Sequence, residues 1–181
     1  MRGQRRRQRA IPTLAVVALA CFNAAIANAA DLLTIGSPFP NWSLVDQTGK
    51  PVSSSELAGK KYLLWFYPKA MTPGCTAEGD GLRDRFADLQ KAGVAVFGVS
   101  FDQPQDNARF VHEQQFPFRL LSDTDRQLAI AVGAADSPQQ PVAKRISYLI
   151  GDDGQVLRVY GSVTPATHAD EVLRDLTGSP R

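Results

Sequence analysis

Apolar residues form two unbroken runs in the middle of the chain, at residues 62–67 and 94–99. Runs of this length without polar alternation are typical of strands that are buried on both faces of a sheet. Between the runs, apolar residues recur at helical spacing: Leu82, Phe86 and Leu89. We therefore expect one helix over residues 75–91, flanked by two parallel strands.

Weaker patterns of the same kind lie on either side of this unit. Short apolar segments flank a polar turn at residues 46–50, which predicts an N-terminal hairpin, and a short helical turn follows at residues 56–57. Residues 146–150 and 156–160 predict a second hairpin, closed by a turn at residues 152–154. Helices are also expected at residues 105–114, 125–132 and 168–176, and a surface loop is expected at residues 133–141.

The order of these elements predicts the fold class. A parallel unit first, with an antiparallel hairpin and a terminal helix last, matches a mixed central sheet that is covered by helices on both faces. We therefore expect an α/β chain with a thioredoxin-like plan and an N-terminal hairpin. No internal repeat or low-complexity tract follows residue 30, so residues 30–181 are expected to form one domain.

The first 29 residues follow a different pattern. Five arginines and no acid among the first nine residues precede an apolar stretch at residues 10–26, and residues 27–29 have a small-x-small ending. This arrangement is typical of a signal peptide, and the stretch is shorter and more polar than the roughly 20 apolar residues of a spanning helix. We expect removal of residues 1–29 and an exported, most simply periplasmic, protein. A retained anchor, twin-arginine export and lipidation of Cys21 stay open as alternatives.

Removal of this leader changes the charge of the protein. The whole chain has 20 basic and 18 acidic residues and a formal net charge of +2. Five of the basic residues lie in the leader, which leaves 15 basic residues against 18 acidic ones, a net charge of −3. A mildly acidic domain gives no electrostatic reason to expect binding to nucleic acid or to an anionic membrane.

Export would also leave one thiol in the mature protein, because Cys21 departs with the leader and Cys75 stays. Exported proteins usually pair their cysteines in disulfides, so a lone exported thiol needs another explanation. Cys75 is expected at the start of a helix, where unpaired backbone N–H groups and the helix dipole favour a thiolate. Thr72 could place its hydroxyl against the sulfur, and Pro68 would stiffen the turn.

Pro68, Thr72 and Cys75 reproduce the PxxxTxxC signature of the peroxiredoxins, and residues 66–76 resemble the bacterioferritin-comigratory, or Q-type, branch of that family. The resemblance extends over residues 35–176 and includes three further segments: residues 96–100, 117–123 and 145–150. It implies a thiol peroxidase that reduces hydrogen peroxide and organic hydroperoxides through a sulfenic acid on Cys75, with no metal or organic cofactor.

The resemblance also implies a role for each residue around the sulfur. Arg145 would stabilise the thiolate and polarise the peroxide, in the manner of an oxyanion hole. Pro68 and Thr72 would contact the bound peroxide together with Arg145. Glu78 would have a supporting role.

The chain departs from the Q-type branch at Asp80, which stands where many members carry a resolving cysteine. The sulfenic acid must then be reduced by an outside thiol: a thioredoxin-like protein, a glutaredoxin with glutathione, another low-molecular-weight thiol, or a second copy of Cys75. Asp80 is expected to face solvent, and the protein to be a monomer or a weak homodimer.

Two other functions stay open. An exported thioredoxin-like protein for thiol exchange or binding would keep the fold without peroxidase activity, although disulfide exchangers generally rely on paired cysteines. A buried and inert Cys75 would be purely structural.

Plainer interpretations also exist for the other residues. Arg145 could form an ordinary surface ion pair, and Thr72 could cap a helix. Trp65 and Phe66 are expected in the core. His112 and His168 have no acidic or cysteine partners at ligand spacing, so we expect both to be solvated and predict no metal site.

Overall fold

The computed structural model describes residues 31–178, and the predicted leader with its cleavage site and Cys21 lies outside these residues. The elements, in chain order, are β1 (Ser43–Asp46), β2 (Pro51–Ser53), the 3-10 helix η1 (Ser54–Leu57), β3 (Lys61–Phe66), α1 (Pro73–Asp84), α2 (Phe86–Lys91), β4 (Val94–Ser100), α3 (Pro104–Gln114), β5 (Arg119–Ser122), α4 (Gln127–Ala131), β6 (Ile146–Ile150), β7 (Val156–Tyr160), the 3-10 helix η2 (Pro165–Thr167) and α5 (His168–Leu176). None of the helices in this described part is long and apolar enough to cross a bilayer.

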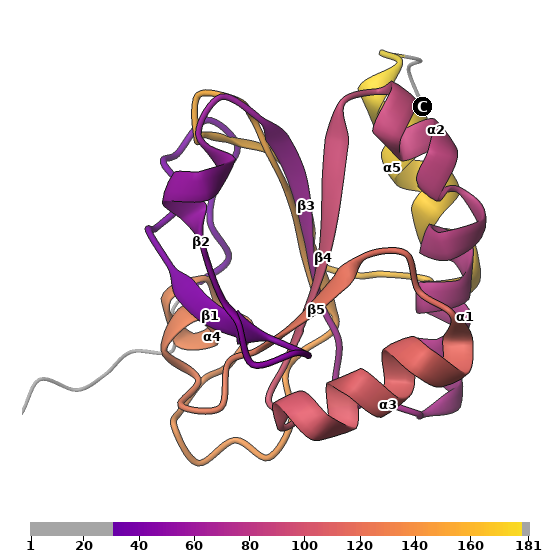
Figure 1. Ribbon diagram of the computed structural model, residues 1–181. Helices are drawn as coiled ribbons and strands as arrows, with labels where there is room; N and C mark the ends of the chain where they lie inside the picture. The colour runs from indigo at the N-terminus through magenta and orange to yellow at the C-terminus, as the bar shows by residue number, and fades with distance from the viewer. Residues whose placement is uncertain (1–30, 179–181) are drawn as a thin grey trace, which may run out of the picture.

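The strands form a mixed sheet in the order β2-β1-β5-β4-β3-β6-β7 (Figure 1). Strands β3, β4 and β5 are parallel, and the hairpins β1-β2 and β6-β7 join them in antiparallel fashion. Helices α1, α2, α3 and α5 lie on one face of the sheet, and η1 and α4 lie on the other. The predicted thioredoxin-like α/β fold, with both hairpins and the parallel unit, is confirmed.

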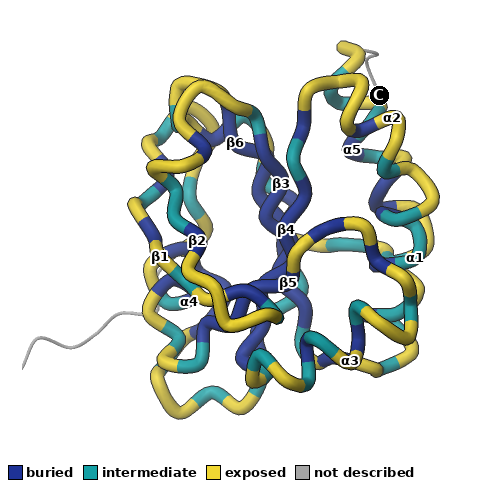
Figure 2. The backbone as a smooth tube through the Cα atoms, viewed as in Figure 1, coloured by how far each residue is buried: buried dark blue, intermediate teal, exposed yellow. Residues whose placement is uncertain are grey.

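Strand β3 shows why its sequence is apolar throughout. Leu63 and Trp65 point into the core beneath α1, α3 and α5, whereas Leu64 and Phe66 point into the core on the α4 side. All four side chains have no exposed surface. Figure 2 shows the central strands as the buried part of the backbone. Burial on both faces removes the usual polar alternation, and Trp65 and Phe66 are core residues as expected.

The predicted helix over residues 75–91 is in fact two helices, α1 and α2. The chain leaves helical geometry at Arg85, which has φ −100° and ψ 4°. Leu82 and Leu89, on either side of the break, are both fully buried on the same face of the sheet. The apolar spacing therefore runs through the break, which is why the pattern did not reveal it.

In the second half of the chain, one strand was missed and the start of a loop was misplaced. Strand β5 was not predicted, because its four residues are too few to establish a periodicity. The predicted surface loop at residues 133–141 begins inside the protein, where Ala134 and Ala135 are fully buried. Their N–H groups donate to the carbonyl oxygen of Ala129, at 2.7 and 3.0 Å, so these residues extend the end of α4.

Two glycines of α1 give a matched test of packing beneath this helix. A Cβ added at Gly79 would lie 2.3 Å from the ring of Phe116, whereas one added at Gly81 would meet no atom closer than 3.9 Å. We expect Gly79→Ala to lower the free energy of unfolding by about 1–3 kcal/mol through overpacking. Gly81→Ala is expected to raise it by roughly 0.5–1 kcal/mol, because alanine loses less backbone entropy in a helix. Urea unfolding of both variants checks this, and equal effects would contradict it.

Candidate active site

The fold places Cys75 at the carboxyl end of β3, where the chain turns into α1. The N–H of Tyr67 donates to the carbonyl oxygen of Val99 at 3.0 Å, which continues the pairing of β3 with β4 one residue beyond the strand. The N–H of Ala70 then donates to the carboxylate of Asp102 at 2.9 Å. These contacts fix the loop between the strand and the helix at the edge of the sheet where ligands commonly bind in α/β proteins.

Cys75 is the third residue of α1, which begins at Pro73 and not at Cys75 as expected. The side chain of Cys75 has no exposed surface, and it is a free thiol. The first-turn N–H groups of a helix have no acceptor within the helix, and they favour a negative charge beside them. A thiolate at this position is therefore stabilised by the backbone.

Arg145 reaches the sulfur because of the register of the sheet. Strand β6 runs antiparallel to β3 with Ile146 opposite Phe66, so the residue before β6 lies beside the end of β3. Arg145 donates from Nη2 to the Sγ atom of Cys75 at 3.3 Å and from Nη1 to a carboxylate oxygen of Glu78. Burial would lower the pKa of Arg145, but Cys75 and Glu78 together hold that pKa above its ordinary value. The guanidinium stays charged.

Glu78 lies one helical turn after Cys75 and has no exposed surface. Burial raises the pKa of Glu78 to about 7, although the charge of Arg145 opposes that rise. Its Oε2 atom accepts from Arg145, and its Oε1 atom has no hydrogen-bond partner among the described residues. This carboxyl group therefore changes its charge close to neutral pH, directly behind the residue that contacts the sulfur.

Thr72 and Pro68 occupy the loop that leads into α1, and both are half-buried. Thr72 is the N-cap residue, but its side chain makes no capping hydrogen bond, so the interpretation of its hydroxyl as a helix cap is wrong. The hydroxyl instead donates to the carbonyl oxygen of Lys69 at 2.9 Å. This contact uses the hydroxyl proton, and the oxygen can still accept a hydrogen bond from a ligand.

His168 is the functional candidate that the sequence led us to misjudge. It was expected to be solvated, yet its side chain has no exposed surface. Its Nε2 atom lies 2.9 Å from the hydroxyl of Ser147 and 4.0 Å from Oε1 of Glu78. An available signal was the spacing of His168 and Val172, four residues apart on the buried stripe of α5.

The other two expectations about polar residues hold. His112 is exposed, and Asp80 is partly exposed and pairs with Arg83 at 2.6 Å. Within the described residues, no group of three or more histidine, cysteine, aspartate or glutamate side chains is arranged to hold a metal ion.

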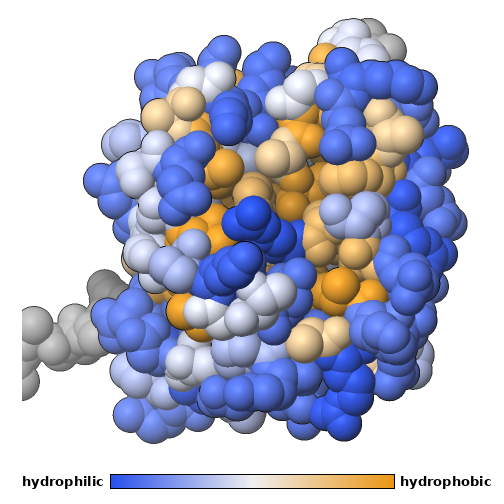
Figure 3. Space-filling model, viewed as in Figure 1, coloured by the Kyte–Doolittle hydropathy of each residue, from blue (hydrophilic) through white to orange (hydrophobic). Residues whose placement is uncertain are grey.

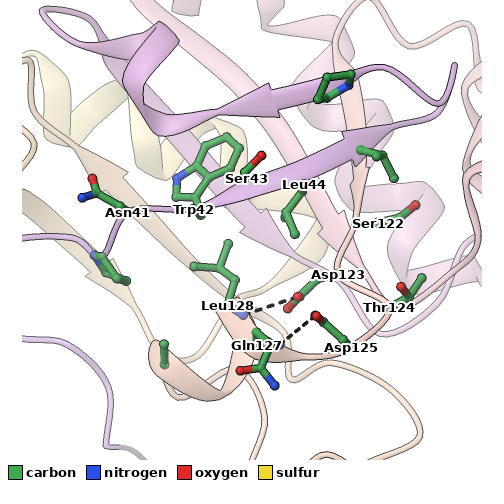
Figure 4. A pocket seen from close by; sticks show the side chains of 14 residues that line it. Asn41, Trp42, Ser43, Leu44, Ser122, Asp123, Thr124, Asp125, Gln127 and Leu128 are labelled. Atoms are coloured by element: carbon green, nitrogen blue, oxygen red, sulfur yellow. Dashed lines mark hydrogen bonds between the residues drawn. The ribbon is translucent and has the colours of Figure 1, made fainter.

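Two hollows lie away from the thiol. One of about 430 Å³ lies between β1 and α4 and is shown in Figure 4, where Asp123 accepts from the backbone N–H of Leu128. The other, of about 500 Å³, lies between η1 and α2 and forms much of the apolar surface in the middle of Figure 3. Neither is lined by Cys75 or Arg145, so neither forms part of the cluster around the sulfur.

A thioredoxin-like sheet that carries a buried cysteine in the first turn of a helix, with an arginine on its sulfur, defines a class of thiol-dependent peroxidases. The comparisons give the same class. Residues 35–159 match the model of the AhpC/TSA family. The chain is 40% identical to peroxiredoxin Bcp of Escherichia coli (strain K12) over 146 residues, which cover 78% of this chain and 94% of that protein. It is 35% identical to the chloroplastic peroxiredoxin Q of Sedum lineare over 143 residues, which cover 78% and 77% of the two chains.

Solved structures of the same class have a similar fold. Peroxidoxin BcpB from Mycobacterium tuberculosis superposes with a TM-score of 0.74 at 30% identity, covering 81% of this chain and 98% of that one. The bacterioferritin comigratory protein of Xanthomonas campestris superposes with a TM-score of 0.70 at 31% identity, covering 75% and 90%. The chain therefore belongs to the AhpC/TSA family of peroxiredoxins, in the Bcp/PrxQ branch, and it is a thiol peroxidase that reduces hydroperoxides.

Proposed function

We propose that Cys75 is the peroxidatic cysteine, that Thr72 and Arg145 act on the bound peroxide with Pro68 shielding the sulfur, and that an external thiol completes the cycle. The observation that carries this proposal is the 3.3 Å contact between Nη2 of Arg145 and Sγ of Cys75, at the N-terminus of α1. A charged donor fixed on the sulfur favours the thiolate, which is the form that attacks a peroxide.

The reaction begins when the Cys75 thiolate attacks the terminal oxygen of ROOH. The sulfur electron pair forms the S–O bond, the O–O bond breaks, and its electron pair leaves on the alkoxide, which takes a proton to give ROH. Arg145 lies where negative charge moves from sulfur to oxygen, so it stabilises the transition state without having to move. The oxygen of Thr72 accepts a hydrogen bond from the peroxide O–H. The product on the enzyme is a sulfenic acid.

An outside thiol then attacks the Cys75 sulfenic acid, releases water and forms a mixed disulfide, which a second thiol reduces. Asp80 stands where a resolving cysteine would otherwise act, so we assign no internal disulfide to this chain. Because Cys75 has no exposed surface, a protein thiol can reach the sulfur only when the first turn of α1 opens. A thioredoxin-like protein, a glutaredoxin and a low-molecular-weight thiol all supply the chemistry that this step needs.

The substrate range in the proposal includes hydrogen peroxide and organic hydroperoxides. The Xanthomonas campestris relative is described by its alkyl peroxide reduction activity, which supports the organic class for this chain. No metal or organic cofactor has a role in the proposed cycle, because the thiol supplies the nucleophile and Arg145 supplies the charge stabilisation.

The test is a reaction of the protein with one equivalent of hydrogen peroxide, followed by intact mass in the presence and absence of a sulfenic-acid trap. A Cys21→Ser background makes Cys75 the sole thiol. We expect one oxygen to be added within seconds, and we expect none in the matched Cys75→Ser control. A Cys75 thiol that stays unmodified for many minutes would contradict the proposal.

Export to the periplasm is a separate part of the proposal and rests on the pattern of residues 1–29. It predicts that the protein recovered from its own cells begins at Ala30 or Asp31, with a net charge of −3 and no Cys21. N-terminal sequencing of the native protein decides this, because a chain that still carries residues 1–29 would contradict removal of the leader.

Gly74 offers a prediction about the placement of Arg145. A Cβ at Gly74 would lie 3.1 Å from Nη2 of Arg145, so Gly74→Ala should push the guanidinium by a few tenths of an ångström. We expect the rate constant for hydrogen peroxide to fall by roughly threefold to tenfold, because small misplacements of catalytic groups are costly. The thermal midpoint should hold or rise, since alanine suits a helix better than glycine. Stopped-flow kinetics and a melting curve check both, and an unchanged rate would contradict the prediction.

A further inference from the structure

A line of buried polar groups continues behind the active site. It runs from Cys75 through Arg145 and Glu78 to His168, which begins α5, and it ends at Ser147 in β6. Cys75, Glu78, His168 and Ser147 have no exposed surface. Buried polar side chains need partners, so an aligned set of them beside the reacting sulfur calls for a function.

The ring of His168 is held in one orientation. Its Nε2 atom lies 2.9 Å from the hydroxyl of Ser147, and its ring packs edge-on against Tyr160 with the centroids 5.0 Å apart. Its Nδ1 atom is buried and has no hydrogen-bond partner among the described residues. A proton on Nδ1 would be a buried donor without an acceptor, so the favoured neutral tautomer carries its proton on Nε2. The Nε2 atom is then within donating distance of Ser147 and lies 4.0 Å from Oε1 of Glu78.

His168 is neutral at physiological pH. Burial, and then the charge of Arg145, lower the pKa of His168 to about 4. The N–H dipole of the neutral ring is therefore what His168 presents to Oε1 of Glu78, 4.0 Å away, the carboxylate oxygen that has no other partner in the described part of the chain.

We propose that His168, oriented by Ser147, is a positioning residue for peroxide reduction: its Nε2–H favours the ionised form of Glu78, which in turn holds the guanidinium of Arg145 against Cys75. The inference rests on the proposed role of Cys75 and adds two residues that do not touch the sulfur. An ionised carboxylate makes a charge-assisted hydrogen bond to an arginine, and the protonated form loses the attraction between the two opposite charges.

The groups that face Glu78 come from two other parts of the fold: Arg145 before β6, which also contacts Cys75, and His168 on α5. Tyr160 packs edge-on against the His168 ring, and three charged groups act on its phenol: Asp175, Glu171 and Arg158. Glu78 therefore ionises between the cation of Arg145 and the neutral imidazole of His168.

This arrangement predicts that the rate constant for hydrogen peroxide increases with pH around neutrality, and we call this rising part of the pH profile the limb. Because the pKa of Glu78 is raised to about 7, the rate should fall as pH drops through neutrality and Arg145 loses its anionic partner. His168→Leu removes the N–H dipole, so Glu78 should take up its proton at a higher pH. The limb should move up by roughly 0.5–1 pH unit. Ser147→Ala, which frees the ring, should move it in the same direction by less.

The experiment measures the rate constant for hydrogen peroxide between pH 5 and 9 in the wild-type protein and these variants. His168→Gln is the conservative variant, because its amide N–H can stand where Nε2 stood, and we expect it to keep the limb near the wild-type pH. Val172→Ala is the matched control, since it truncates a fully buried side chain one turn further along α5. We expect it to lower stability without moving the limb. A limb that stays fixed in His168→Leu would overturn the inference.

A second readout does not depend on catalysis. The infrared band of the protonated Glu78 carboxyl group, assigned by its loss in Glu78→Gln, should reach its midpoint at a higher pH in His168→Leu than in the wild-type protein. Equal midpoints would overturn the inference. If the wild-type protein consumed no peroxide, the proposed function would fail, while the infrared midpoints would still decide whether His168 sets the ionisation of Glu78.

Discussion

Replacement of Arg145 with alanine is expected to lower the rate constant for hydrogen peroxide by about 10²–10³-fold, the usual cost of removing one preorganised donor from a transition state. Arg145 is the residue that joins the two charged parts of the site, since one nitrogen contacts the sulfur and another contacts Glu78. Lysine cannot reproduce this fork, because its ammonium group is a single point of contact. Arg145→Lys should therefore recover only part of the loss, and stopped-flow kinetics with excess peroxide measures both variants.

Arg145→Ala should also destabilise the protein, because it leaves Glu78 without a counter-ion at a position with no exposed surface. Breaking a buried pair by removal of one partner costs about 3–5 kcal/mol. The double variant Arg145→Ala, Glu78→Gln removes both charges. We expect it to recover most of the free energy of unfolding and none of the rate. A single Arg145→Ala variant that kept its rate within about threefold would contradict the assigned role.

The elements that bring this site together are far apart in the sequence. The first turn of α1 supplies Cys75, the segment before β6 supplies Arg145, and α5 supplies His168. The antiparallel register of β3 and β6 fixes the first contact, and the packing of α5 against α1 fixes the second. The geometry around the thiol therefore depends on elements from most of the fold. A displacement of any of these elements should change the contacts of the sulfur.

The parts of the fold that could be predicted were those that leave a local pattern. Strands β3 and β4 are buried on both faces, so each needed an unbroken apolar run that is visible in the sequence. The break at Arg85 was not visible, because Leu82 and Leu89 keep helical spacing across it. Strand β5 was too short to show a period.

The same distinction applies to the site. Cys75 and Thr72 lie within one turn of each other, so their grouping is a local property that the sequence displays. Arg145 was identified through the family resemblance, because its contact with the sulfur depends on strand register and not on spacing. His168 was misjudged because the sequence shows no acidic or cysteine partner at ligand spacing from it. Its burial comes from tertiary packing against Ser147 and Tyr160.

Glu78 and His168 give the protein two opposite pH dependences of stability that nearly cancel. The pKa of Glu78 is raised from its ordinary value of 4.5 to about 7, so between these values the folded protein holds a proton that the unfolded chain has released. This contribution is fully present below pH 4.5 and is lost as pH rises to 7. The pKa of His168 is lowered from 6.5 to about 4, so its contribution is present above pH 6.5 and is lost as pH falls to 4. Each contribution is worth about 3 kcal/mol.

Single variants should separate the two contributions to the pH dependence of the free energy of unfolding. In Glu78→Gln the contribution of His168 is no longer offset by Glu78, so we expect the free energy of unfolding, relative to the wild-type protein, to fall by about 3 kcal/mol between pH 6.5 and 4. In His168→Gln the contribution of Glu78 is no longer offset by His168, and the free energy of unfolding, relative to the wild-type protein, should fall by a similar amount between pH 4.5 and 7. Urea unfolding at a series of pH values measures both slopes against the wild-type protein.

Asp123 supplies an internal control for this comparison. Burial raises the pKa of Asp123 to about 6, so its own contribution falls as pH rises from 3.8 to 6. Its carboxylate accepts from the N–H groups of Leu128 and Ala129 at the start of α4, on the other face of the sheet, so this slope should be the same in all three proteins. The difference between each variant and the wild-type protein then isolates one group. Parallel curves for the three proteins would mean that Glu78 and His168 do not titrate in opposition. Difference curves of opposite slope for the two variants would show that the pH dependences of these two groups offset each other beside the active site.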